Sequence, residues 1–171
     1  MTTQMQLGDQ AISRCDSPTD CYRIFSEEMD SLYFLAYLLT ADQEMAERCF
    51  GSGLEECVDR FSVLLGSARS WARTAIVKCS IGIIRPAPLE DAQFVDANRP
   101  AIVGVGSPFG TILSLPAFER FVFVMSILEG RADEDCVNLL SCSRQDFMTA
   151  RKNSLKRFGA ACQLDTNRFV C

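Results

Sequence analysis

The sequence predicts an all-α protein of two small helical domains joined by a Pro/Gly-rich linker. Apolar residues recur at three- and four-residue intervals in the first and last parts of the chain. Between them, residues 86–115 hold four of the six prolines and no helical period. The 171 residues are 48% hydrophobic and 23% charged, as expected of a globular protein with one core or two small ones. We therefore expect domains at residues 16–85 and 116–160, with the linker at 86–115.

Three helices are expected in the first domain. Residues 16–20 supply helix-starting side chains, and the apolar stripe over 21–39 predicts one long amphipathic helix. Residues 40–42 predict a short break with a new N-cap, after which the stripe continues over 45–57. A third helix is expected over about 67–84, because the prolines that follow it end a helix.

The second domain is expected to hold a helix-turn-helix. A helix is expected over residues 116–130 and a short helix from about residue 133, followed by a tight turn at 140–143. Ser143 and Asp146 have the spacing of a capping box, which predicts the start of a third helix. Helix, short helix, turn and basic helix is the order found in helix-turn-helix proteins.

Several function classes are excluded by composition. The chain contains no histidine, which excludes histidine bases, Ser-His-Asp systems and zinc sites that use imidazole. Its nine cysteines include no Cys-x-x-Cys pair and are expected to be reduced and buried. We expect no cofactor, no metal and no catalytic residues, so the protein is not expected to be an enzyme. No apolar run is long enough to span a membrane and no signal peptide precedes the first helix, so a cytoplasmic location is expected.

The net charge of −5 conceals two basic segments in an acidic protein. Residues 16–65 contain eleven acidic residues and three basic ones, whereas residues 66–85 contain four basic residues and no acidic one. Residues 143–158 contain five basic residues and one acidic one. Such segments form either two solvated helix faces or two surfaces that contact phosphates.

The last predicted helix has the residue types that read DNA in the major groove. Base edges are contacted from the first turns of a recognition helix, where Arg144, Gln145 and Thr149 lie. Phosphates are contacted from its flanks and far end, where further cations lie: Arg151, Lys152, Lys156 and Arg157. A plain bundle helix with basic residues for solubility explains the pattern equally well.

Five segments together resemble the extracytoplasmic-function type of bacterial RNA polymerase sigma factor. Residues 115–130, 139–143 and 150–157 are similar to the family's C-terminal domain, which binds the upstream promoter element. Residues 32–46 resemble the start of its N-terminal domain, and residues 71–79 resemble its Trp-centred helix, which lies by the downstream element.

The resemblance implies two partners, promoter DNA and core RNA polymerase. Trp71 and the cations Arg69, Arg73 and Lys78 would face the downstream promoter region. The first domain would hold a coiled coil of the polymerase β′ subunit, and the linker would run toward the RNA exit. An anti-sigma factor is a further partner that such a protein can have.

Two alternatives remain open beside the sigma factor. One is a degenerate relative that keeps the fold and binds a protein partner without directing transcription, which Gly51, Gly53 and Met148 favour because they depart from the family's usual residues. The other is a stand-alone helix-turn-helix regulator whose first domain dimerises.

Overall fold

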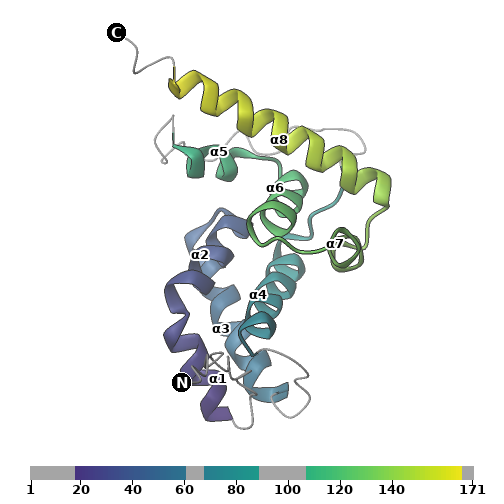
Figure 1. Cartoon of the computed structure of the whole chain (residues 1–171). Coiled ribbons are helices and arrows are strands. Elements are labelled where there is room, and N and C mark those ends of the chain that lie inside the picture. Colours follow the sequence, from purple (N-terminus) through teal and green to yellow (C-terminus); the bar gives the residue numbers. More distant parts are fainter. Residues whose placement is uncertain (1–17, 61–67, 89–106, 167–171) are drawn as a thin grey trace, which may run out of the picture.

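The computed structural model describes residues 18–60, 68–88 and 107–166, and every regular element in these ranges is helical, which confirms the all-α prediction (Figure 1). In the same ranges, no helix is both long and apolar enough to cross a membrane. Residues 89–106 of the expected linker lie outside the described part of the chain. The elements are, in chain order, α1 (Pro18–Glu27), α2 (Met29–Thr40), α3 (Gln43–Arg60), α4 (Ala68–Ile84), α5 (Pro108–Ser114), α6 (Ala117–Phe123), the π-helix η2 (Val124–Leu128), α7 (Asp133–Leu140) and α8 (Arg144–Thr166).

The prediction of one helix over residues 21–39 is wrong, because the chain bends at Glu28 (φ −103°, ψ 12°) between α1 and α2. The hydrogen-bond ladder continues across the bend: the Glu28 amide donates to the Ile24 carbonyl at 2.9 Å, and the Leu32 amide donates to the Glu28 carbonyl at 2.8 Å. Ile24 and Leu32 are buried on either side of the bend. The apolar period therefore runs through a change of helix direction that it does not signal.

The expected break after α2 is confirmed. Ala41 adopts a left-handed conformation (φ 53°), and its amide donates to the Tyr37 carbonyl. The Asp42 carboxylate then accepts a hydrogen bond from the Met45 amide at 2.9 Å, which caps the start of α3. Thr40, at the end of α2, donates its hydroxyl hydrogen bond to the Ala36 carbonyl at 2.9 Å.

Close packing of α3 on α4 depends on Gly53. A β-carbon built at this position would lie 2.8 Å from Cδ1 of Ile76, a fully buried residue of α4. Gly51, which lies just before it on the same helix, has open space around the corresponding position. Of these two glycines, Gly53 is therefore the one that the packing requires.

The C-terminal elements follow the expected order. The helix predicted over 116–130 is α6 continued by the π-turns of η2, and it ends at Gly130, whose φ of +60° suits glycine. After α7, Ser141 takes a left-handed conformation. Ser143 then donates to the Asp146 carboxylate at 2.6 Å and accepts from the Asp146 amide at 3.0 Å, so the predicted Ser143 cap of α8 is present and Asp146 binds its hydroxyl.

Helix α5 is an element that the sequence did not predict, since residues 86–115 show no helical period. Pro108 occupies the first turn of this seven-residue helix, where a missing amide hydrogen costs nothing. Ile112 is its buried residue. Seven residues make about two turns, which is too short for an apolar period to be recognised.

The N-terminal and C-terminal helices share one cluster of buried side chains. Arg120 of α6, which is 3% exposed, donates to the carbonyls of Leu39 and Thr40 at the end of α2, at 3.1 and 3.3 Å. The same guanidinium donates to the carbonyls of Leu113 and Leu115 at the end of α5, at 3.4 and 3.0 Å. Helix ends leave such carbonyls without partners, so this one buried cation joins α2, α5 and α6.

Figure 1 shows the arrangement that results, with α8 lying across α5 and α6 and the four helices α1 to α4 below them. An exposed aromatic pair adds to the junction between the two parts: the rings of Phe34 (α2) and Phe109 (α5) meet edge to face with centroids 5.3 Å apart.

Candidate nucleic-acid interface

The outer face of α8 presents most of the residues expected to read DNA. Phe147, Ala150 and Ser154 are buried and fix which side of the helix faces the protein. Four exposed residues lie opposite them: Gln145, Thr149, Lys152 and Lys156. Arg144 is also exposed, but it precedes Phe147 by three residues and so lies at the edge of the buried side. Because the capping box fixes the first turn, Arg144 and Gln145 lie at the very start of the helix.

Three cations of this face carry charge that no carboxylate of the described residues offsets. Arg144, Lys152 and Lys156 form no ion pair within the part of the chain that the structure describes. Asp146 is the acidic residue among them, and its carboxylate accepts the Ser143 hydroxyl. The face can therefore attract phosphates without first breaking an internal contact.

The other two arginines of this helix are paired with carboxylates of the protein itself. Arg151 donates to Asp133 of α7 at 2.8 Å, which fixes α7 against α8. Arg157 lies 3.1 Å from the Glu119 carboxylate, which is 4% exposed. A buried carboxylate needs a partner of opposite charge, so Arg157 stabilises α6 against α8. The structure thus places Arg151 apart from the free cations of the outer face.

Two of the basic residues of α4, Arg69 and Arg73, form ion pairs with carboxylates of this protein. Arg69 pairs with Glu28 at 3.2 Å and lies 3.9 Å from Glu27. Arg73 donates to both carboxylate oxygens of Glu129, at 2.6 and 2.7 Å, and to the Ser31 hydroxyl at 2.8 Å. The hydrogen bonds to Glu129 are the main cause that raises the pKa of the Arg73 guanidinium above its usual value.

Trp71 and Lys78 differ from these arginines in their surroundings. Trp71 is half-buried and packs against the core cluster, so part of its ring surface is committed to the fold. Lys78 is exposed and has no ion pair among the described residues. The four residues expected to face the downstream promoter therefore do not form one open surface as the α8 residues do.

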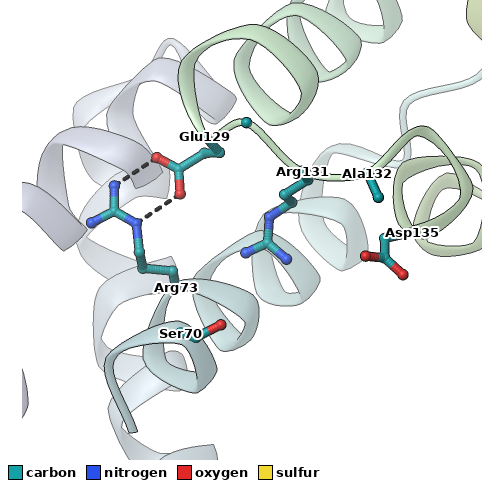
Figure 2. A pocket seen from close by; sticks show the side chains of 7 residues that line it. Ser70, Arg73, Glu129, Arg131, Ala132 and Asp135 are labelled. Atoms are coloured by element: carbon teal, nitrogen blue, oxygen red, sulfur yellow. Dashed lines mark hydrogen bonds and ion pairs between the residues drawn. The ribbon is translucent and has the colours of Figure 1, made fainter. Parts of the chain in front are cut away.

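A pocket that the sequence did not indicate lies between α4 and the segment that joins η2 to α7 (Figure 2). Its volume is about 500 Å³. Its polar lining comes from Ser70 and Arg73 on α4 and from Glu129, Arg131 and Asp135 on the other side. No local sequence pattern could have found it, because its two walls are more than fifty residues apart in the chain.

The described cysteines are free thiols. Burial is the main cause that raises the pKa of Cys136 from 9.0 to about 11. It also raises the pKa of Cys79 to about 11, with Glu56 adding to the effect. Both thiols are therefore protonated and weakly nucleophilic at neutral pH. Within the ranges described above, no group of three or more His, Cys, Asp or Glu residues could hold a metal ion.

The comparisons with known proteins identify no relative. No family model matches the chain, and neither a curated protein nor a solved structure does.

Proposed function

We propose that this protein is a promoter-binding initiation factor similar to the extracytoplasmic-function sigma factors, with no enzymatic step of its own. The observation that supports this most directly is the outer face of α8. It combines exposed arginine, amide and hydroxyl groups at the start of the helix with unpaired lysines farther along it. This is the distribution that a helix inserted into the major groove requires.

In this proposal, α7, the turn at residues 141–143 and α8 form the helix-turn-helix. Arg144 and Gln145 have the side chains that pair with guanine and adenine in the major groove, and Thr149 can donate or accept. Lys152 and Lys156 contact phosphates and set the affinity and its dependence on salt. Arg151 acts indirectly, since its ion pair with Asp133 fixes α7 against α8.

Contacts between α4 and the downstream promoter DNA require two ion pairs of the protein to open first. Arg69 and Arg73 reach phosphates only after they leave Glu28 and Glu129. Upstream binding through α8 needs no such change. We therefore infer that α8 binds DNA first and that α4 contributes when the ion pairs of Arg69 and Arg73 have opened.

The test is the salt dependence of binding to duplex DNA. A plot of log K against log salt concentration has a negative slope, and each phosphate contact that is lost makes this slope less steep by about 0.9. The double variant Lys152→Ala/Lys156→Ala should therefore have a slope smaller by about 1.8. Arg60→Ala, which removes an exposed cation of α3, is the control and should leave the slope unchanged. The proposal fails if the double variant and the control have the same slope as the unmodified protein.

A protein-binding relative without DNA-binding activity is the second candidate. The observation that favours it is the engagement of Arg69 and Arg73 with acidic residues of this same chain, because it removes positive charge from the expected downstream surface. DNA affinity that is weak and independent of salt in the unmodified protein would support this candidate over the first.

A further inference from the structure

The pocket between α4 and the η2–α7 segment contains an arginine with unused hydrogen-bonding capacity. Arg131 donates from Nη1 to the Thr74 hydroxyl at 3.2 Å. Its Nε is buried and has no hydrogen-bond partner in the structure. It also has no ion pair with the carboxylates of residues 18–60, 68–88 and 107–166. Because the buried Nε is closed to a ligand in the pocket, the donors that remain available are those of the two terminal nitrogens.

The neighbouring charges leave this guanidinium available. Arg73 occupies both carboxylate oxygens of Glu129, so Glu129 does not compete for Arg131. Figure 2 shows the Arg131 guanidinium between this ion pair and Asp135. Asp135 is the remaining acidic residue of the lining; it is exposed and lies in the first turn of α7, where the helix dipole favours a negative charge.

The first turn of α4 contributes to the opposite wall of the pocket. Ser70 lies in this turn, which contains no acidic residue to offset the helix dipole. Free amides and the dipole at a helix start favour an anion, and the Ser70 hydroxyl can donate a hydrogen bond to it. The Arg131 guanidinium and the Ser70 hydroxyl thus line one pocket.

We propose that this pocket binds an oxyanion, specifically a phosphate group, through the guanidinium of Arg131 and the hydroxyl of Ser70. The phosphate comes either from the backbone of a nucleic acid or from a free phosphate compound. The pocket joins α4 to the C-terminal helices, so a bound phosphate also strengthens the contact between them. The inference does not depend on the sigma-like function.

Calorimetric titration with inorganic phosphate tests the site in the full-length protein. Arg131→Gln should weaken phosphate binding by about tenfold or more, because a charge-assisted contact is lost. Asp135→Asn should strengthen it severalfold, because a like charge leaves the pocket; a gain of affinity cannot result from unfolding. Arg60→Gln, a charge change on α3, is the control and should have no effect.

Duplex DNA of arbitrary sequence identifies the source of the phosphate. If the slope of log K against log salt concentration becomes less steep by about 0.9 in Arg131→Gln, the site is assigned to a nucleic-acid backbone. An unchanged slope, together with the loss of inorganic phosphate binding, assigns it to a free phosphate compound. If Arg131→Gln and Asp135→Asn alter neither phosphate nor DNA binding, the site does not exist, whatever the outcome of the tests on α8.

Discussion

Arg73 and Glu129 are 56 positions apart in the sequence and form a two-pronged ion pair, with Nε to Oε2 at 2.7 Å and Nη2 to Oε1 at 2.6 Å. The third nitrogen of the guanidinium donates to the Ser31 hydroxyl at 2.8 Å. One side chain of α4 thereby holds both α2 and the end of η2. This contact links the N-terminal and C-terminal helices at a residue that the resemblance assigns to promoter DNA.

Replacing Glu129 by Gln should lower the free energy of unfolding by about 1–3 kcal/mol, because it leaves a partly buried guanidinium without its counter-charge. Glu27→Gln is the matched control: Glu27 also pairs with arginines, but its side chain is 47% exposed. An exposed pair is worth well under about 1 kcal/mol. Urea unfolding of the two variants checks the prediction, and equal losses would contradict it.

The two glycines of α3 should respond in opposite ways to alanine. Gly51→Ala should raise the free energy of unfolding by about 0.5–1 kcal/mol, because this exposed helix position has room for a methyl group. Gly53→Ala gains the same propensity but must displace the buried Ile76 side chain, and such overpacking costs about 1–3 kcal/mol. Thermal or urea unfolding measures both variants. If Gly53→Ala is as stable as Gly51→Ala, the Ile76 side chain can move aside without cost and the prediction is wrong.

Loss of the α8 cap should destabilise the protein. In Ser143→Ala the Asp146 amide loses its acceptor, which should cost about 1 kcal/mol. Asn153→Ala, at an exposed position in the same helix, should cost far less. Urea unfolding compares the two. If Ser143→Ala costs no more than Asn153→Ala, the box does not stabilise the start of α8.

Cys136 should make stability fall at alkaline pH. Its thiol has a pKa of about 11 in the folded protein and 9.0 otherwise, so the folded state holds the proton more tightly. The resulting stabilisation is complete below pH 9.0 and is lost as the pH rises toward about 11. The stability difference between the unmodified protein and Cys136→Ala should therefore be constant near neutrality and shrink over this window. A difference that stays constant to pH 11 would contradict the assignment.

Signals within a few residues of one another predicted the local structure well. The break after α2, the capping box of Ser143 and Asp146, and the helix end at Gly130 each depend on short side-chain or backbone contacts, and the structure has all three. The outward position of Gln145 and Lys152 also follows from the helical period, because Phe147 and Ala150 are buried opposite them.

Features that depend on distant parts of the chain were not predicted. The partners of Arg73, and the Leu39 and Thr40 carbonyls that Arg120 binds, come from helices far away in the sequence. Arg73 was expected to contact DNA because charge counts do not reveal which carboxylate the fold brings to a cation. Two local features were also not predicted. The break at Glu28 keeps the helical hydrogen bonds on both sides, and α5 is too short to show an apolar period.

An initiation factor must bind bacterial core RNA polymerase, so binding to this enzyme is the decisive measurement for the proposed function. The purified full-length protein is mixed with core polymerase and passed through a size-exclusion column, with a housekeeping sigma factor as competitor. We predict that the two co-elute and that the competitor abolishes the co-elution. No co-elution at micromolar concentrations of both proteins would contradict it and leave the protein-binding relative as the better description.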